Sequence, residues 1–424
     1  MPRWAFVFKE EIYMAKKDNF VVGLDIGTTK ICAVVAERDE NGVPRVTGVG
    51  ITPSYGLRKG VVVNLESTID SIEKVVELAE DMAQVEIQSV FAGIAGGHIK
   101  SFNSRGAVPI THKDNEITDD DVKRVISMAR AVNIPIDREV LHTIPQEYIV
   151  DGQGGIKNPR GMSGVRLEAE VHIVTGAITS AQNIVKCIQR AGLGVEDIVL
   201  QPLASSMTTL TQEEKDSGVI LIDIGGGTTD VVLYLNGAVR HTYVLSVGGD
   251  NLTNDIAIGL KIPIAKAEEI KKRFGCARAS MVDENEEFML PGVIGRAAAR
   301  MQRRQLVSII EMRMEEIFDL VKQDIERTGY GELISSGIVL TGGTSLLKGS
   351  TEMAQDIFGV PVRLGTPRGV TGLVEVLDSP IYSTGVGLSL YGLQYRDRDG
   401  NNIKGRNIFE IILKRMTEWV GEYF

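Results

Sequence analysis

Two stretches of the chain repeat one pattern, in which two apolar runs flank a short turn that contains glycine. In the first, over residues 20–37, the turn reads Asp25-Ile-Gly-Thr-Thr. In the second, over residues 218–235, it reads Asp223-Ile-Gly-Gly-Gly-Thr-Thr-Asp. Continuous apolar runs of this length are typical of strands that are buried on both faces. The repetition therefore predicts two β-hairpins in two related halves of the molecule, each with a central sheet that opens on one shared cleft.

Helical and strand-like periodicities alternate along the rest of the chain, which predicts an α/β fold. We expect helices over residues 66–85, 119–132, 180–191, 251–260, 265–274 and 296–327. We expect strands over residues 90–110, 167–175, 195–200 and 338–340, and a loop over residues 152–164. Thr118 stands directly before the second of these helices and predicts an N-terminal cap there.

The end of the chain divides into a polar linker, residues 394–405, and an amphipathic stretch, residues 406–424. The apolar residues of this stretch recur at helical spacing and predict one stripe of a helix: Ile408, Phe409, Ile412, Leu413, Met416, Trp419, Val420, Tyr423 and Phe424. Charged residues on the opposite face exclude a membrane-spanning helix.

The stripe fits either a helix packed on the protein's own core or a helix that lies in a membrane surface. The polar linker and the aromatic residues near the end favour the membrane surface. Lys414 and Arg415 would then be attracted to anionic lipid.

Composition narrows the possible functions. The chain has 424 residues, of which 43% are hydrophobic and 24% charged, and this balance excludes a disordered or fibrous protein. The net charge of −10 argues against nucleic acid as a partner. The cysteines lie far apart, which favours a reducing cytosol, and the scattered histidines predict no metal cluster. Met14 is also a candidate for the residue at which translation starts, in place of Met1.

The two turns have the chemistry of a phosphate site. Backbone N–H groups of glycine-rich turns bind phosphate oxygens, and a carboxylate beside them holds Mg²⁺, usually through water. One such turn is more often an ordinary hairpin turn, but two of them, with Thr341-Gly-Gly-Thr after a later strand, favour a nucleotide site. The turns match neither a Walker loop nor a dinucleotide-binding fingerprint. The sequence therefore predicts Mg-ATP between the hairpins, with Asp25 and Asp223 in the magnesium sphere.

These motifs resemble those of the actin-like ATPase superfamily. The resemblance implies a first phosphate motif made of Asp25, Gly27, Thr28, Thr29 and Lys30. It implies a second made of Asp223, Gly225, Gly226, Gly227, Thr228 and Thr229. It also implies adenosine contacts from Gly342, Gly343 and Thr344.

The resemblance implies roles for three further side chains. Glu268 and Lys271 would lie toward the ribose and base, although glutamate and lysine at this spacing more often form a plain surface pair. Gln201 would position the attacking water. Because its amide cannot accept a proton, we expect at most a slow ATPase.

Within that superfamily the chain is similar to the FtsA family of bacterial cell-division proteins. The similarity is carried by residues 90–99, 201–206, 221–230, 337–343 and 382–388. It implies an actin-like fold of two related halves around a nucleotide cleft, with a small subdomain inserted in the first half. It further implies an ATP-binding, self-polymerising, peripheral membrane protein. Such a protein tethers the FtsZ ring to the cytoplasmic face of the cell membrane at the division site and contacts other division proteins.

The similarity also implies subdomain boundaries. The first core subdomain is expected over residues 18–83, 167–214 and 369–393, with the insert over 84–166. The second is expected over residues 215–248 and 329–368, with a small subdomain over 249–328. The FtsZ C-terminal peptide would dock on this small subdomain, where one helical face is expected to carry Arg296, Arg300, Arg303 and Arg304. An ordinary solvated basic face explains these arginines equally well.

Two other classes of protein share the phosphate motifs. A small-molecule kinase needs a catalytic base aimed at a substrate hydroxyl, and no further Asp or His stands in an obvious motif for it. A pilus-assembly or shape-determining relative of actin would share the nucleotide site but not the combination of insert, linker and terminal amphipathic stretch. Assembly on a lipid monolayer with ATP, compared with phosphorylation of a panel of sugars, separates these classes.

Overall fold

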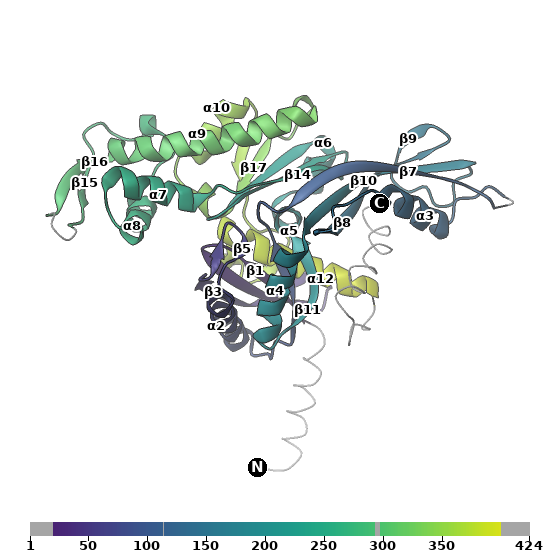
Figure 1. The fold of residues 1–424 in the computed structure, drawn as a ribbon, viewed down its shortest axis with the longest axis horizontal. Helices are drawn as coiled ribbons and strands as arrows, with labels where there is room; N and C mark the ends of the chain where they lie inside the picture. The colour runs from purple at the N-terminus through teal and green to yellow at the C-terminus, as the bar shows by residue number, and fades with distance from the viewer. Residues whose placement is uncertain (1–19, 113, 293–296, 400–424) are drawn as a thin grey trace, which may run out of the picture.

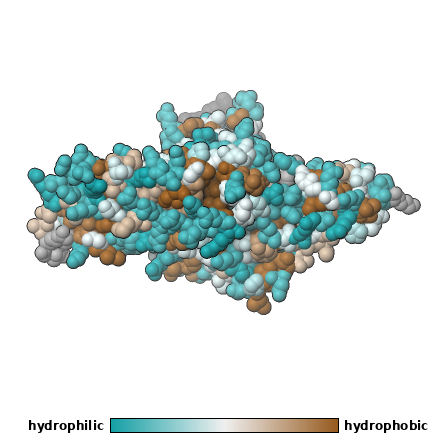
Figure 2. Space-filling view, turned by 90° about the horizontal axis from the view of Figure 1, so that it is seen from above, coloured by the Kyte–Doolittle hydropathy of each residue, from teal (hydrophilic) through white to brown (hydrophobic). Residues whose placement is uncertain are grey.

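The computed structural model describes residues 20–112, 114–292 and 297–399. Within them, three large sheets and the helices that cover them form an elongated body (Figure 1). In this view the first-half sheet lies in the lower middle, below strands β14 and β17 of the second half, while the inserted subdomain extends to one side and helices α7 to α9 extend to the other. Figure 2 shows this body from above, with hydrophilic residues over most of the surface and apolar residues gathered near the middle.

The first predicted hairpin is confirmed and lies in a six-stranded sheet with the order β11-β6-β1-β2-β3-β19. The strands are β1 Phe20–Ile26, β2 Lys30–Arg38, β3 Pro44–Pro53, β6 Ser89–Ile94, β11 Gly194–Leu200 and β19 Thr371–Gly372. The helices around it are α2 Leu65–Ala83, α4 Ile178–Arg190 and α12 Ser383–Asp399. The backbone of α2 comes close to Gly48 and Gly50 of β3, and that of α12 comes close to Gly23 of β1. Glycine at these positions lets each helix lie directly on the sheet.

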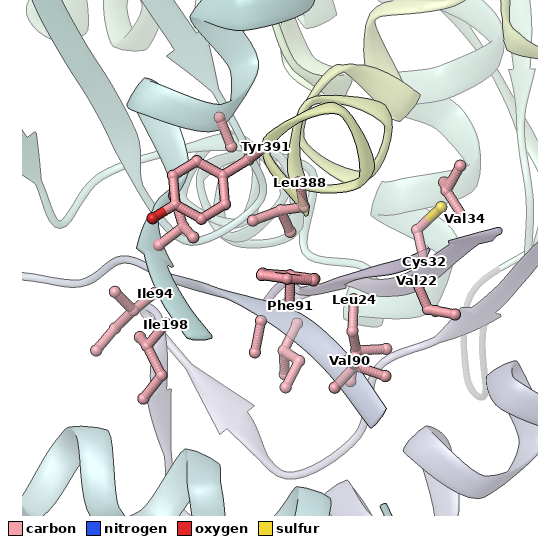
Figure 3. Packing of buried hydrophobic residues seen from close by; sticks show 14 of the residues in the cluster. Val22, Leu24, Cys32, Val34, Val90, Phe91, Ile94, Ile198, Leu388 and Tyr391 are labelled. Carbon is pink, nitrogen blue, oxygen red and sulfur yellow. The ribbon is translucent and has the colours of Figure 1, made fainter. Parts of the chain in front are cut away.

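The core of the first half lies between this sheet and α12 (Figure 3). Phe91 of β6 packs edge-on against Tyr391 of α12, with ring centroids 6.0 Å apart. The Tyr391 hydroxyl donates a hydrogen bond of 2.7 Å to Asp197, so this large side chain is buried with its polar end satisfied.

The second predicted hairpin is also confirmed, in a five-stranded sheet with the order β14-β13-β12-β17-β18. The strands are β12 Val219–Ile224, β13 Thr229–Leu235, β14 Ala238–Leu245, β17 Ile338–Thr341 and β18 Val362–Leu364. Helix α5, Gln201–Thr209, contacts strands of both central sheets. Its side chains therefore stand where the two halves meet.

The inserted subdomain has a four-stranded sheet with the order β7-β10-β8-β9, covered by helix α3 around a core of its own. The elements are β7 Lys100–Pro109, α3 Asp119–Arg130, β8 Arg138–Val150, β9 Gln153–Ile156 and β10 Arg166–Ala177. The predicted cap is confirmed, because Thr118 and Asp121 form a capping box.

The inserted subdomain begins and ends at later residues than the expected range 84–166. Strand β6 belongs to the first-half sheet, whereas β10 pairs along its length with β7 and β8. Strand β9 also lies inside the expected loop over 152–164, because Tyr148 and Ile156 pair across a tight turn.

The small subdomain contains α7 Gly249–Leu260, α8 Ile264–Phe274, β15 Glu287–Leu290, β16 Ala299–Gln302 and α9 Arg303–Thr328. The helix predicted over residues 296–327 is wrong at its start. Residues Ala299–Gln302 form a strand because they pair with β15, where Phe288 and Leu290 are buried. The remaining helices and strands are β4 Leu57–Arg58, β5 Val61–Val62, α6 Gln212–Ser217, η1 Ala279–Met281, η2 Gly331–Leu333, η3 Gly343–Leu346, α10 Ser350–Phe358, α11 Val374–Leu377 and η4 Pro380–Tyr382.

The predicted linker over residues 394–405 is wrong in its first part, because α12 continues through Asp399. Arg396 donates a hydrogen bond of 2.6 Å to the Phe20 carbonyl, and Asp397 accepts one of 3.2 Å from Arg38. The polar residues that suggested a flexible connection thus fasten the helix to the first-half sheet. The later linker residues and the amphipathic stretch lie outside the described residues.

Replacing Gly387 with alanine is expected to destabilise the protein by about 3 kcal/mol. A Cβ at this position of α12 would lie 3.1 Å from the Ser205 backbone nitrogen and far inside contact distance of the Ala204 carbonyl. The matched control is Gly331→Ala, because the nearest atom to a Cβ there is the Ile325 Cγ2 at 3.7 Å. Denaturant unfolding of both variants checks this, and an equal loss of stability would contradict the packing described for α12.

Candidate nucleotide-binding site

The turns of the two central hairpins face each other. A Cβ placed on Gly227 would lie 2.8 Å from the Cβ of Thr28, and one placed on Gly226 would lie 2.7 Å from the Thr29 hydroxyl oxygen. Two segments about 200 residues apart in sequence therefore meet at residues that were predicted to contact phosphate. Only glycine permits so close an approach at positions 226 and 227.

Asp25 closes strand β1 and is almost completely buried. Its carboxylate accepts a hydrogen bond of 2.7 Å from Lys30 Nζ and one of 3.1 Å from Gln201 Nε2. Burial lowers the pKa of Lys30, but the charge and hydrogen bond of Asp25, together with smaller contributions from Cys32 and Asp223, more than offset this and leave the pKa above its ordinary value. Lys30 therefore stays charged, and α5 supplies Gln201 to the first turn.

Asp223 closes strand β12 and is held by two hydroxyl groups. Ser205 donates to its Oδ2 over 2.8 Å and Thr384 over 3.3 Å. Burial raises the pKa of Asp223 to about 6, against the opposing effect of the Ser205 hydrogen bond. Sequence reasoning missed both hydroxyls. Both residues lie in segments that carry the family similarity, 201–206 and 382–388, which was a usable signal. Neither segment by itself indicates that its hydroxyl contacts Asp223.

Asp230 is a further acidic residue that sequence reasoning left out of the site. It lies directly opposite Asp223 in the hairpin register, and its Oδ2 accepts a hydrogen bond of 2.8 Å from Thr228. Burial and the charge of Asp223 raise the pKa of Asp230 to about 8. Its Oδ1 is buried without a hydrogen-bond partner in the described part of the chain.

The Thr341-Gly-Gly-Thr segment lies beside the second turn. Thr344 donates a hydrogen bond of 2.8 Å to the Gly225 carbonyl. Gly342 has a φ of 85°, and a Cβ there would lie 2.6 Å from the Ile224 carbonyl oxygen. At Gly343, by contrast, a Cβ would meet only Ile381, at 3.6 Å. Gly342 is thus required by the fold itself, whereas a Cβ at Gly343 would make only an ordinary contact with Ile381.

Glu268 and Lys271 are not a plain surface pair. Lys271 is 8% exposed and donates to the Gly249 carbonyl over 3.0 Å and to Thr253 over 2.8 Å. Its Nζ also lies 2.6 Å from Glu268, which accepts a hydrogen bond from Thr253. The Gly249 N–H donates to the Gly225 carbonyl over 2.9 Å. This cluster therefore joins α7 and α8 to the second turn.

The predicted basic helical face is not formed by the arginines that the structure describes. Arg300 lies in β16, and Arg303 and Arg304 begin α9. Each lies near an acidic residue: Arg300 near Glu287, Arg303 near Glu286 and Arg304 near Glu284. Arg296 lies outside the described residues, as do the apolar residues predicted to contact membrane. Across residues 20–112, 114–292 and 297–399, no helix has the length and hydropathy for a bilayer crossing.

The side chains present fit a nucleotide that carries a divalent cation. Buried carboxylates with raised pKa values are costly when ionised, and a nearby cation offsets that cost. Asp230, whose Oδ1 has no hydrogen-bond partner among the described residues, lies opposite Asp223 in the hairpin. Hydroxyl and N–H donors of the two turns supply the complementary groups for phosphate.

Replacing Asp230 with asparagine is expected to change how stability depends on pH. A carboxyl whose pKa is raised to about 8 by folding stabilises the protein below its unfolded pKa, near 4. It loses this contribution as the pH rises through the folded value. Without nucleotide, the melting temperature of the wild type should therefore fall relative to Asp230→Asn between about pH 5 and about pH 8. A difference that stays constant over this range would contradict a buried Asp230 carboxyl whose pKa is raised by folding.

The order of the strands and the two facing turns give the chain an actin-like fold. Among solved structures, the chain is similar to the "PilM-PilN type IV pilus biogenesis complex", with a TM-score of 0.65 and 18% identity over 88% of this chain and 98% of that one. It is also similar to MreB5 of Spiroplasma citri bound to ADP, with a TM-score of 0.56 and 15% identity over 91% of this chain and 100% of that one. A related structure of that protein holds AMPPNP.

The particular family follows from sequence. The profile "Cell division protein FtsA" matches residues 220–387, and "SHS2 domain inserted in FTSA" matches residues 96–175. The chain is 48% identical to the cell division protein FtsA of Pseudomonas aeruginosa, over 96% of this chain and 98% of that protein. It is 40% identical to the FtsA of Escherichia coli K12, over the same shares of the two chains. The chain therefore belongs to the FtsA family of cell-division proteins.

Proposed function

We propose that the chain binds Mg-ATP between its two central turns, assembles into filaments, and tethers the FtsZ ring to the cytoplasmic face of the cell membrane. The observation that carries the proposal is the close approach of Thr28 to Gly227 and of Thr29 to Gly226. One phosphate chain would reach donors of both halves at once in this arrangement. Bound nucleotide would thus fix the orientation of the two halves relative to each other. A change of nucleotide would then change the shape of the subunit and control its assembly into filaments.

In this proposal, Asp25 and Asp223 face the magnesium sphere. Bound Mg²⁺ would supply positive charge between the carboxylates and the phosphate oxygens. No group of three or more His, Cys, Asp or Glu side chains in the described part of the chain is arranged as a metal site. Phosphate and water would therefore supply most of the ligands, as magnesium prefers. Gly343, whose missing side chain is not demanded by the packing of the fold, would admit the adenosine.

Hydrolysis would be slow. Gln201 Nε2 donates to Asp25, which leaves the amide oxygen to accept a hydrogen bond from water. A neutral amide orients that water but does not take its proton. The bound nucleotide would serve mainly assembly.

Membrane attachment is proposed on residues 406–424 alone, from the apolar stripe described above. A single amphipathic helix of this kind binds weakly, and filament formation would multiply the contacts. Polymerised protein should therefore hold membrane far better than monomer does.

Docking of the acidic FtsZ C-terminal peptide on residues 249–328 is expected to depend on Arg300 and Arg304. Their acidic neighbours belong to the same β15 region, and Arg300 is 79% exposed, so a partner carboxylate has access to it. The double variant Arg300→Glu/Arg304→Glu should weaken peptide binding by about tenfold or more. Fluorescence anisotropy with a labelled peptide measures this, with Arg190→Glu, on α4, as the control. Equal affinity in all three proteins would contradict this docking surface.

A vesicle sedimentation experiment tests the whole proposal. The full chain is mixed with anionic vesicles and Mg-ATP, with Mg-ADP, or without nucleotide, and the filaments are counted by electron microscopy. We expect filaments and strong pelleting with Mg-ATP only. Pelleting without filaments under all three conditions would contradict the link between nucleotide and assembly.

A further inference from the structure

A two-residue turn, Lys59–Gly60, lies beside the first phosphate turn. Strands β4 and β5 pair through Leu57 with Val62 and through Arg58 with Val61, which leaves Lys59 and Gly60 as the connecting residues. Their φ angles are 52° and 76°. Positive φ at both central positions is the signature of a type I′ hairpin turn, and lysine rarely occupies such a position.

This turn contacts the phosphate turn directly. The N–H of Gly60 donates a hydrogen bond of 3.1 Å to the hydroxyl oxygen of Thr28. On its other side, a Cβ on Gly60 would lie 2.8 Å from the Ala95 carbonyl oxygen and 2.9 Å from the Gly96 Cα. Gly60 is therefore wedged between Thr28 and the loop after β6, and no side chain fits there.

The hydrogen bond from Gly60 determines which donor and acceptor positions of the Thr28 hydroxyl are still available. A hydroxyl has one proton to donate and two lone pairs to accept with, and here one lone pair accepts from Gly60. In the described part of the chain, the Thr28 hydroxyl donates to no protein group. Thr28 also faces Gly227 of the second turn. Its proton is thus available at the place where the two turns meet.

We infer that the Lys59–Gly60 turn is a positioning element for nucleotide binding, whose Gly60 N–H fixes the Thr28 hydroxyl so that its proton is donated to a phosphate oxygen. The inference rests on the proposed nucleotide site and deepens it. Gly60 itself touches no phosphate and acts through Thr28. The left-handed backbone at Lys59 and the contact with Gly96 keep the turn in place.

A double-mutant cycle tests this inference, because residues that act through one another do not have additive effects. Mg-ATP affinity of the full chain is measured by calorimetry for the wild type, Gly60→Ala, Thr28→Val and the double variant. We expect each single variant to bind about tenfold more weakly, the usual effect of one lost hydrogen bond. The double variant should be no weaker than the weaker single variant.

Three controls separate positioning from general damage. In Thr28→Ser, which keeps the hydroxyl, Gly60→Ala should still weaken binding about tenfold. Gly155→Ala adds the same methyl group at a β9 glycine with a φ of 74°, where a Cβ would meet no atom within 4 Å, so this variant should bind as the wild type does. Melting temperatures show whether Gly60→Ala remains folded, and Thr28→Val retains its value as a test if it does not.

Three results would overturn the inference. They are additive losses in the cycle, full affinity in Thr28→Val, and an equal loss in Gly155→Ala, which would assign the effect to a methyl group at any left-handed glycine. Failure of the wild type to bind Mg-ATP would instead overturn the proposed function, so the two failures are distinguishable.

Discussion

Replacing Asp223 with asparagine should weaken Mg-ATP binding by about 100-fold, the effect of removing an interaction with a charged group. Asparagine keeps the size of the side chain and can still accept hydrogen bonds from Ser205 and Thr384. Only the negative charge toward the magnesium sphere is lost. Since burial raises the pKa of Asp223 to about 6, the wild-type affinity should itself fall as the pH drops below that value.

Calorimetry at about pH 7.5 measures this effect. The matched control is Asp216→Asn, which changes a half-exposed aspartate of α6 whose side chain interacts with Lys157 and Gln212. The control should bind as the wild type does. Wild-type affinity in Asp223→Asn would show that the nucleotide lies elsewhere or needs no charge at this position.

Ending the chain after Gly400 should release the protein from anionic vesicles. The truncation removes the amphipathic stretch, whose apolar burial would supply most of the membrane affinity. Within the full chain, Trp419→Glu should lower the bound fraction by about tenfold, because it places a charge in the apolar stripe.

Co-sedimentation with vesicles in the presence of Mg-ATP measures both variants. Thr417→Glu is the matched control, because it adds the same charge on the polar face and should pellet nearly as well as the wild type. Undiminished pelleting of the truncated chain would mean that the amphipathic stretch packs on the protein's own core.

Much of the fold was predictable because the central strands are buried on both faces. The runs that end in Asp25 and Asp223 are apolar throughout, and the turns between the strands carry their own glycine and threonine signals. The chemistry of these turns predicted residues that contact phosphate, and two of them, Thr28 and Gly227, lie close together in the structure.

Other features depended on tertiary contacts that leave little trace in the sequence. The residues before α9 were predicted as helix, yet pairing with β15 makes Ala299–Gln302 a strand. The start of the linker was predicted as flexible from its polarity, yet Arg396 and Asp397 bind the first-half sheet. Polarity does not distinguish a linker from the exposed end of a helix.

The groups that hold the side chains of the candidate site in place also depend on contacts between segments that are far apart in the sequence. Thr384 approaches Asp223 from 161 residues away in the sequence, and Gly60 approaches Thr28 from 32 residues away. Neither contact follows from a local pattern. Asp230 could have been predicted, because the hairpin register that the sequence indicates places it opposite Asp223.

The central claim is that nucleotide bound between the two turns drives assembly on a membrane. Electron cryo-microscopy of the full chain on an anionic lipid monolayer with Mg-ATP tests it most directly. The account predicts filaments in which each subunit has nucleotide density between Thr28 and Gly227. Filaments without density there, or nucleotide bound at another place, would contradict it.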